Sequence, residues 1–380
     1  MNQAQTEKPT VVFEQGLIAN YRVPFFKRLA ERVNLVVVAS KITNHDGVID
    51  VDRNLPFNAI RLQENDNGFH PDIFEVLETS RADVFISFDA SLYHIFSHRE
   101  SDLRLRSLKV RTLWMGCDGY WIDNLYLEKF LRFAPWNPRK ILKGIKDLVV
   151  VPEADGIIAH SNYMVDYFRV IHSVAADKIF LAHNAVDTSL IRAYVFRKDF
   201  EKRSGGIVYV GRLTPGKKID SLLRAYKQIE NYFPDSFLTI VGDGSLRPSL
   251  ENYAKEIGLR RCFFAGAIYN DIDLAKIVCV HSLGVLPGLG GLGINTLMAC
   301  GLPVIASRAD GTGLDLIRNG VNGFLFNGTD KDLLKKLTEA MNDPQNLISM
   351  GERSFEKIEN EFSLDQMVDG YLRAIGNNHD

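Results

Sequence analysis

Short apolar runs alternate with longer amphipathic segments along most of the chain, and this alternation restricts the fold more than any other feature of the sequence. The runs are near-continuous stretches of apolar residues, as expected for parallel strands that helices cover on both faces of a sheet. The sequence therefore predicts an α/β protein. The predicted strands are 10–14, 35–39, 84–88, 112–115, 156–159 and 179–182 in the first half, and 207–210, 237–241, 262–265, 283–286, 303–306 and 324–326 in the second. Helices are predicted at 219–230, after Gly293 and at 364–375.

The alternation stops at a polar, weakly periodic stretch and then starts again, which indicates two doubly wound domains. A length of 380 residues is long for one domain and sufficient for two. We predict a first Rossmann-like domain at 1–187, a linker at 188–204 and a second Rossmann-like domain at 205–360. The remaining 361–380 is expected to form a helix that packs back on the first domain. Ligands of such domains bind at the carboxyl ends of the strands, so the expected site is a cleft between the two domains.

Charge, cysteine spacing and hydropathy exclude several classes of protein. The net charge of −2 gives no overall attraction to nucleic acid, so no nucleic-acid partner is expected. The four cysteines form no CxxC pair and no zinc-ligand spacing, which favours a reducing compartment. The N-terminal stretch lacks the features of a signal peptide, and no run reaches the roughly 18 apolar residues that cross a bilayer. We therefore expect a cytoplasmic protein. The cysteines are Cys117, Cys262, Cys279 and Cys300.

Two cations follow the first strand of the second domain. Strand 207–210 runs into Gly211 and Arg212, and Lys217 precedes the next helix. Cations beside such a strand-to-helix turn can hold a diphosphate through charge-assisted hydrogen bonds of about 1.5–3 kcal/mol each. Solvated surface charges are the alternative reading, and this segment alone does not decide between the two.

Glycines follow the next strands. Gly242-Asp243-Gly244 comes directly after strand 237–241, where a plain turn is favoured over a close approach to a ligand. The loop 288–293 is richer in glycine and leads into an apolar helix. Such a loop exposes unpaired N–H groups and the positive end of the helix dipole, which favours an anion site over a loop that serves only close packing. Asp315 lies between later glycine-rich turns that by themselves indicate only a loop.

Read in order, these segments resemble glycosyltransferase family 4 and the wider GT-B group. The matching residues are Gly211-Arg212-Leu213 with Lys217, then Gly242-Asp243-Gly244, then Gly291-Leu292 with 301–305, and then Asp315 with Asn322-Gly323. The first domain resembles the family more loosely, at 154–161 and 178–187. Its segment 21–26 resembles the opening of bacterial surface-polysaccharide members.

The chain departs from the family at one point. Most members carry two glutamates seven residues apart around the third segment, where they are thought to hold the donor sugar and the ribose. Here Thr296 occupies the second position, the loop from Pro287 is shorter, and the first glutamate has no counterpart. Asn295 or Thr296 could replace the glutamates with neutral hydrogen bonds to the donor. A role at the helix surface or as a helix cap is the equal alternative for both residues. We interpret the chain as a member of a divergent subgroup.

The resemblance implies a GT-B fold, with two doubly wound Rossmann-like domains that face each other across a cleft. It implies a nucleotide-sugar donor on the second domain, a saccharide or lipid-linked saccharide acceptor on the first, and retention at the anomeric carbon. Our hypothesis is that Arg212 and Lys217 neutralise the leaving diphosphate. The sequence offers no DxD motif that suggests a metal-bridged diphosphate, so neither a metal nor another cofactor is expected. The predicted donor-binding residues are Gly211, Gly242, Asp243, Gly244, Gly290, Gly291, Leu292, Gly293, Asn295, Thr296 and Asp315.

On the acceptor side, Asp118 follows a strand of the first domain. It is a candidate to orient or deprotonate the acceptor hydroxyl, with a helix N-cap as the equal alternative. Gly16, Tyr21 and Arg22 follow the first strand and are the other predicted acceptor-side residues.

The segment 126–146 interleaves basic and aromatic residues. A solvated helix with its apolar face in the core is favoured here, and contact with an anionic membrane is the alternative.

Three other functions compete with sugar transfer. A nicotinamide oxidoreductase is disfavoured, because the first strand leads into no GxGxxG. A GT-B sugar-nucleotide epimerase and a non-catalytic partner subunit remain alternatives.

Overall fold

The computed structural model of the chain describes residues 8–40, 50–51, 54–66, 68–88, 90–115, 148–203, 205–308 and 311–376. Contacts within the chain divide these residues into two compact units. Unit 1 holds the described residues up to 115, together with 148–183 and 365–376. Unit 2 holds the described residues from 184 to 364.

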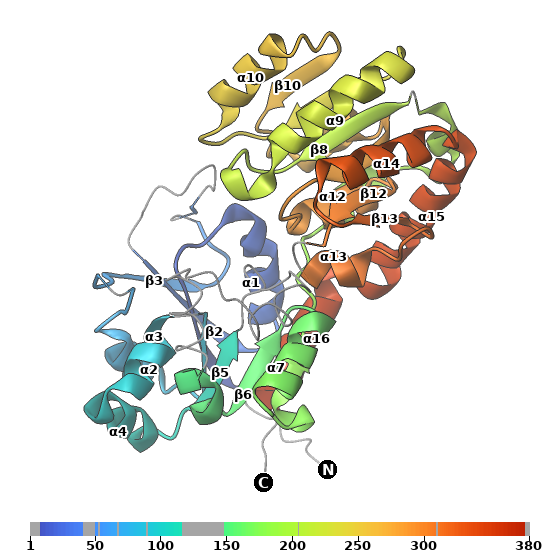
Figure 1. Ribbon diagram of the computed structural model, residues 1–380. Helices are drawn as coiled ribbons and strands as arrows, with labels where there is room; N and C mark the ends of the chain where they lie inside the picture. The colour runs from blue at the N-terminus through green and yellow to red at the C-terminus, as the bar shows by residue number, and fades with distance from the viewer. Residues whose placement is uncertain are drawn as a thin grey trace, which may run out of the picture. The chain divides into compact units, whose positions relative to one another are not determined.

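Unit 1 is built on a parallel sheet of seven strands in the order β3-β2-β1-β4-β5-β6-β7 (Figure 1). The strands are β1 (Thr10–Gln15), β2 (Asn34–Ser40), β3 (Asn58–Leu62), β4 (Val84–Ser87), β5 (Arg111–Met115), β6 (Gly156–Ala159) and β7 (Ile179–Leu181). The helices include η1 (Asn20–Arg22), α1 (Val23–Ala30), α2 (Ile73–Ser80), α3 (Ala90–Ser97), α4 (Arg99–Ser107), α7 (Asn162–Ile171), η2 (Ala176–Lys178) and α16 (Leu364–Gly376).

Unit 2 repeats this plan with a parallel sheet of six strands in the order β10-β9-β8-β11-β12-β13 (Figure 1). The strands are β8 (Gly206–Val210), β9 (Leu238–Val241), β10 (Cys262–Gly266), β11 (His281–Leu286), β12 (Val304–Ser307) and β13 (Gly323–Phe326). The helices include α8 (Ser189–Tyr194), η3 (Arg197–Lys202), η4 (Pro215–Lys217), α9 (Ile219–Tyr232), α10 (Arg247–Glu256), α11 (Asp271–Val278), α12 (Leu292–Ala299), α13 (Gly311–Leu316), α14 (Asp330–Met341) and α15 (Pro344–Glu361).

The two sheets have the same kind of switch point. In unit 1 the chain first adds β2 and β3 on one side of β1 and then continues with β4 on the other side. In unit 2 it does the same around β8, with β9 and β10 on one side and β11 on the other. Ligands of doubly wound sheets bind at the carboxyl ends of the two strands that flank this reversal. The fold thus points to the ends of β1 and β4 in unit 1 and of β8 and β11 in unit 2.

The predicted α/β class is confirmed, and the predicted strands recur with shifts of one or two residues at their ends. One strand of unit 1 was missed. β3 lies at the edge of its sheet, and its residues Asn58–Leu62 are exposed or half-buried. An edge strand has only one neighbour and needs no continuous apolar run, so the apolar pattern that marked the other strands is absent here.

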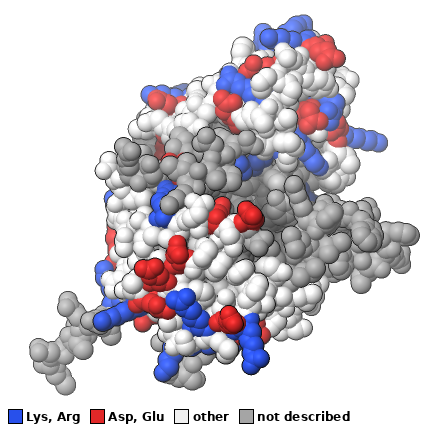
Figure 2. Space-filling view, turned by 90° about the vertical axis from the view of Figure 1, so that its left-hand side faces the viewer, with Lys and Arg blue, Asp and Glu red and all other residues white. Residues whose placement is uncertain are grey.

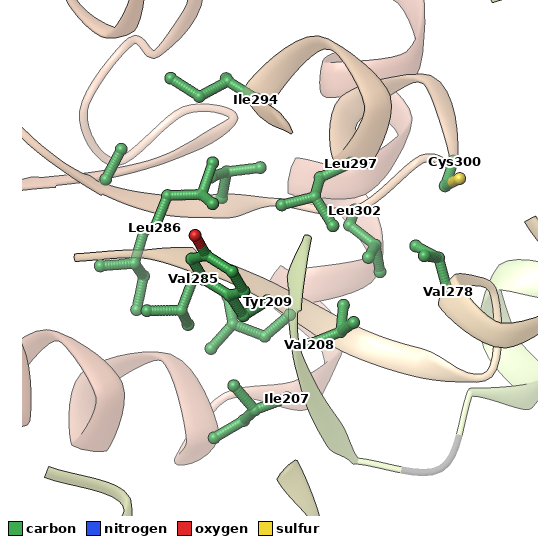
Figure 3. Close-up of a cluster of buried hydrophobic side chains, with 14 of the residues drawn as sticks. Ile207, Val208, Tyr209, Val278, Val285, Leu286, Ile294, Leu297, Cys300 and Leu302 are labelled. Carbon is green, nitrogen blue, oxygen red and sulfur yellow. The ribbon is translucent and has the colours of Figure 1, made fainter. Parts of the chain in front are cut away.

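The core of unit 2 lies between the strands and helices of its sheet (Figure 3). Ile207, Val208 and Tyr209 of β8 are fully buried there, together with Leu297 of α12. The Tyr209 hydroxyl donates a hydrogen bond of 2.8 Å to the Arg212 carbonyl oxygen. Burial raises the pKa of this hydroxyl, so it stays protonated and keeps donating. The core thereby fixes the backbone of the loop that follows β8.

The range expected to be a linker, 188–204, contains α8 and η3. Ile191, Val195 and Phe200 of this range are buried in the core of unit 2.

The terminal helix α16 contributes Tyr371 to unit 1. The Tyr371 ring packs on Phe25 with a centroid distance of 4.8 Å, and its hydroxyl lies 3.0 Å from His160 Nε2.

On the face shown in Figure 2, basic and acidic side chains of the described residues are interspersed. No helix within the described ranges is long and apolar enough to span a membrane.

Candidate functional site

At the switch point of unit 2, the loop after β8 packs against the loop after β11. A Cβ atom on Gly288 would overlap the Gly216 carbonyl oxygen, so only glycine allows this approach. The Leu289 N–H donates a hydrogen bond of 3.0 Å to the same oxygen. In return, Lys217 Nζ donates to the Leu289 carbonyl oxygen at 2.5 Å. The half-buried Lys217 ammonium is therefore held against the glycine-rich loop.

Arg212 lies near the start of the loop that follows β8, and it is exposed. Its backbone is anchored on both sides, because Gly211 N–H donates to the Val241 carbonyl oxygen at 3.0 Å and Tyr209 donates to the Arg212 carbonyl oxygen. Its guanidinium forms no hydrogen bond or ion pair with the residues that the structure describes. A fixed backbone with an uncommitted cation is suited to a ligand that carries negative charge.

The amino end of α12 lies beside the Lys217 ammonium. The cap residue Gly291 has φ +54° and ψ −145°, and no side chain caps the helix. A Cβ atom built on Gly291 would lie 3.8 Å from Lys217 Nζ, so the ammonium is next to the first turn. Gly293 packs so closely on the end of β8 that an added Cβ would lie 2.6 Å from the Val210 carbonyl oxygen. The positive end of α12 and Lys217 are together suited to a ligand that carries negative charge.

The glycines after β9 serve close packing. A Cβ on Gly242 would overlap the Gly211 carbonyl oxygen, and one on Gly244 would lie 2.6 Å from the Leu213 carbonyl oxygen. Asp243 accepts hydrogen bonds from the Gly244 N–H at 2.8 Å and from Arg247 Nη1 at 3.2 Å. The Gly244 N–H bond, followed by Arg247, lowers the pKa of this carboxyl. These contacts explain both glycines without a ligand, and a donor contact at 242–244 stays a prediction.

The predicted substitutes for the missing glutamates lie on α12. The Thr296 hydroxyl donates back to the Leu292 carbonyl oxygen at 3.2 Å. Asn295 is 1% exposed, and its Nδ2 donates to the Asn184 carbonyl oxygen at 3.4 Å. Its Oδ1 is buried and has no hydrogen-bond partner among the described residues. Asp315 is half-buried on α13, the helix that follows β12. Of these three predicted residues, Asn295 is the one with an unsatisfied acceptor.

The predicted acceptor-side residues follow β1 in unit 1. Gly16 is exposed, and a Cβ added there would meet no atom within 4 Å. Tyr21 is 43% exposed. Arg22 lies over the Phe25 ring at 5.5 Å and donates to Met367 Sδ at 3.9 Å. Asp118 and the segment 126–146 lie outside the described residues, so their predicted roles are not addressed.

A buried polar cluster lies at the switch point of unit 1 and was not predicted from the sequence. Glu14 of β1 is 5% exposed and accepts a hydrogen bond of 2.7 Å from Ser87 Oγ and a second from Ser91 Oγ. His70 Nε2 lies 4.0 Å from Glu14 Oε1. Burial lowers the pKa of His70, against the opposing charge of Glu64. A carboxylate inside an apolar run was the available signal.

The structure thus brings together most of the predicted donor residues. The loops that carry Gly211, Arg212, Lys217, 242–244 and 288–293 contact one another at the carboxyl edge of the sheet of unit 2. Contacts between backbone groups hold these loops together, among them contacts of Leu289, Leu213 and Val210. The sequence predicted that these loops lie together but not which of their atoms contact one another.

Known proteins match the chain in this same region. A family profile described as Glycosyl transferases group 1 matches residues 192–357. The UDP-Gal:alpha-D-GlcNAc-diphosphoundecaprenol alpha-1,3-galactosyltransferase of Escherichia coli is 30% identical over 205 residues, which are 50% of this chain and 52% of that protein. The GDP-mannose-dependent alpha-(1-6)-phosphatidylinositol monomannoside mannosyltransferase of Mycolicibacterium smegmatis is 30% identical over 157 residues, 38% of this chain and 41% of that protein. The chain thus spans about half the length of these relatives.

Among solved structures, that of Anabaena Alr3699/HepE in complex with UDP is similar with a TM-score of 0.70 and 16% identity. The match covers 97% of this chain and 99% of that chain. At this identity the likeness concerns the fold. Residues 192–357 therefore resemble a glycosyl transferases group 1 domain, and the chain has the GT-B fold, as its ordered motifs predicted.

Proposed function

We propose that the chain is a glycosyltransferase that moves a sugar from a nucleotide-sugar donor to a saccharide or lipid-linked saccharide. The observation that carries this proposal lies at the switch point of unit 2, where Lys217 lies beside the uncapped end of α12 and the exposed Arg212 follows β8. The glycosyl transferases group 1 domain spans this site. A diphosphate is the anion that matches two cations and a helix end.

In the proposed reaction, the bond between the anomeric carbon and the diphosphate oxygen breaks, and negative charge grows on the leaving diphosphate. Arg212 and Lys217 stabilise this charge, with the N–H groups of 290–293 as further donors. Lys217 is already held by Leu289 and needs little reorganisation. The proposed reaction needs no metal, since the cations supply the charge, and it retains the anomeric configuration.

The other predicted residues position the substrates in this proposal. Asn295, with its buried and unsatisfied Oδ1, accepts a hydrogen bond from a donor hydroxyl, and Thr296 and Asp315 complete the donor pocket. Asp118 orients or deprotonates the acceptor hydroxyl. Gly16, Tyr21 and Arg22 line the acceptor side, and the exposure of Gly16 and Tyr21 leaves room for a bulky group.

The names of the relatives suggest which substrates to try. One relative is named for UDP-Gal and a diphosphoundecaprenol acceptor, and the other for GDP-mannose and a phosphatidylinositol mannoside. Both named acceptors are lipid-linked. We therefore propose a role in cell-surface polysaccharide or glycolipid synthesis in the cytoplasm, at the inner face of the membrane.

The thermal stability of the chain with UDP, GDP, dTDP, CMP and their sugars tests the proposal. A ligand at about a hundred times its dissociation constant adds about 2.7 kcal/mol to the stability of the folded state. We expect a shift from one nucleotide family that Arg212→Ala abolishes. Adding EDTA should leave both the shift and the sugar transfer unchanged. A panel without any shift would instead favour a non-catalytic partner subunit, and a sugar-nucleotide product formed without acceptor would favour an epimerase.

Contact with a membrane is a separate part of the proposal and rests on the basic and aromatic composition of 126–146. Glutamine in place of Lys140, Lys143 and Lys146 should weaken binding to vesicles that contain anionic lipid. Equal binding by the variant and the unsubstituted chain would remove this part of the proposal and leave the donor site unaffected.

A further inference from the structure

Two thiols lie together at the ends of neighbouring helices in unit 2. Cys279 is the C-cap residue of α11, and Cys300 is the C-cap residue of α12. Their side chains are hydrogen-bonded to each other. Cys300 is fully buried in the core cluster near Val278 and Leu302 (Figure 3), whereas Cys279 is partly exposed. The pair thus joins an accessible thiol to a buried one.

A buried cation lies beside this pair. Arg203 donates through Nη1 to the Gly301 carbonyl oxygen and through Nη2 to the Cys300 carbonyl oxygen at 2.6 Å. Its guanidinium stacks over the Phe200 ring at 4.1 Å. Its Nε–H is buried and has no acceptor among the described residues. The Arg203 charge therefore has no carboxylate hydrogen-bonded to it in the described chain, and it acts on both sulfur atoms.

A cavity of about 330 Å³ gives access to this site. Cys279 and Arg203 both line it, together with Phe200 and Asp199. A volume of this size is several times the roughly 30 Å³ that a water molecule occupies in the liquid, so a small polar reagent fits. Cys279 is the cysteine of the pair that such a reagent would reach.

The surroundings separate Cys279 from the other described cysteines. The hydrogen bond from Cys300 lowers the pKa of Cys279, and the Arg203 charge adds to this effect, against desolvation and the charge of Asp199. The same hydrogen bond raises the pKa of Cys300. Cys262 on β10 is also partly exposed, but burial and then the Glu230 charge raise its pKa to about 12. A thiolate is the reactive form of cysteine, so Cys279 is the most reactive of the three.

We propose that Cys279 and Cys300 form a peroxide-reactive dithiol site, in which Cys279 is the attacking thiolate and Cys300 the resolving thiol. The Cys279 thiolate attacks one oxygen of a hydroperoxide, the O–O bond breaks, and the products are a sulfenic acid and hydroxide or alkoxide. The Cys300 sulfur then attacks the Cys279 sulfur and displaces the hydroxyl group as water, with its own proton. The dithiol loses two electrons and the peroxide gains them. Arg203 stabilises the Cys279 thiolate before the first step.

The first test uses the unsubstituted full chain. The reduced protein is alkylated at pH 7, and the labelling of each cysteine-containing peptide is followed by mass spectrometry. We expect Cys279 to react about tenfold faster than Cys262 or more, because well below its pKa a thiol loses about tenfold in thiolate fraction per unit of pKa. Equal rates at the two positions would overturn the proposal.

The second test follows oxidation by hydrogen peroxide. We expect a linked pair of peptides that contain Cys279 and Cys300, lighter by two hydrogen atoms than the reduced pair and restored by a reductant. Cys300→Ser should instead trap a sulfenic acid on Cys279 that dimedone captures. The matched control Cys262→Ser should form the disulfide at an unchanged rate. Oxidation that stops at Cys279 in the unsubstituted chain, or that never reaches Cys279, would refute the dithiol. None of these readouts depends on sugar transfer, so they stand apart from the proposed function.

Discussion

At the ends of β8 and β11, unit 2 presents Arg212, Lys217 and the uncapped end of α12, whereas at the ends of β1 and β4 unit 1 buries the Glu14 carboxylate among serine hydroxyls. Both pairs of strands flank the switch point of a parallel sheet with the same order around it. The same topology thus carries cations at the switch point of one unit and a buried carboxyl group at that of the other.

The difference lies in what the loops are made of. In unit 2 the loops contain glycines that let backbone approach backbone, and they carry the exposed Arg212 and the half-buried Lys217. In unit 1 the space at the end of β1 is filled by polar side chains, and a Cβ on the following Gly16 would meet no atom within 4 Å. A negative ligand is favoured at the first place and disfavoured at the second, which agrees with a diphosphate on unit 2 and an uncharged acceptor hydroxyl on unit 1.

The largest expected effect comes from removing a cation of unit 2. We expect Arg212→Ala and Lys217→Ala each to lower kcat by about 10²–10³-fold, the usual cost of removing one preorganised donor of transition-state stabilisation. Arg212→Ala should leave the melting temperature unchanged, because its exposed side chain has no described partner. Activity assays with the donor chosen by the nucleotide panel measure kcat for both variants, and thermal unfolding measures the melting temperature. Lys255→Ala, which removes an exposed lysine of α10, is the control. An equal loss in that variant would point to overall charge and not to the site.

A methyl group added at two glycines should separate tight packing from open space. A Cβ on Gly242 would overlap the Gly211 carbonyl oxygen, and Gly242 has φ +143°. Gly242→Ala should therefore lower the free energy of unfolding by about 1–3 kcal/mol, toward the upper end. Gly16→Ala should change it by less than about 0.5 kcal/mol, since nothing lies within 4 Å. Chemical denaturation of both variants measures the contrast. Similar values for the two would mean that the loops of unit 2 are not close-packed in solution.

A buried histidine in each unit, His160 in unit 1 and His281 in unit 2, should make the stability of the two units depend on pH in the same way. Burial lowers the pKa of His160 in unit 1 to about 3 and that of His281 in unit 2 to about 4. Below pH 6.5 the unfolded chain binds protons that the folded chain does not, so stability falls as the pH falls toward these values. From pH 6.5 to pH 5, each histidine should cost about 2 kcal/mol of unfolding free energy.

Denaturant titrations at several pH values measure this slope. His160→Gln should remove the share of His160, while His98→Gln, which replaces an exposed histidine of the same unit, should keep it. An unchanged slope in His160→Gln would show that His160 is not buried as a neutral ring.

The sequence predicted the parts of this molecule that depend on local composition. Buried strands such as β8 and β11 are marked by continuous apolar runs, and the order of the glycine-rich segments predicted the GT-B fold. β3 was missed because the polar residues Asn58 and Arg61 interrupt its apolar run. Hydrogen bonds between residues far apart in the chain were also not predicted. Glu14 meets Ser87 across 73 residues, and Lys217 meets Leu289 across 72, and no local pattern encodes either distance.

The smallest expected effect comes from neutralising the buried anion of unit 1. A glutamine at position 14 keeps one oxygen that accepts from a serine, and its NH₂ group faces the other serine. A serine hydroxyl can rotate and accept in place of donating, so both hydrogen bonds survive with changed roles. Glu14→Gln should therefore cost about 1 kcal/mol of unfolding free energy or less, whereas Glu14→Ala leaves two buried hydroxyls without an acceptor and should cost more. Because Glu14 belongs to unit 1, nucleotide binding should match that of the unsubstituted chain in the same thermal assay as Arg212→Ala. A loss of nucleotide binding in Glu14→Gln as large as in Arg212→Ala would break the division of roles between the two switch points.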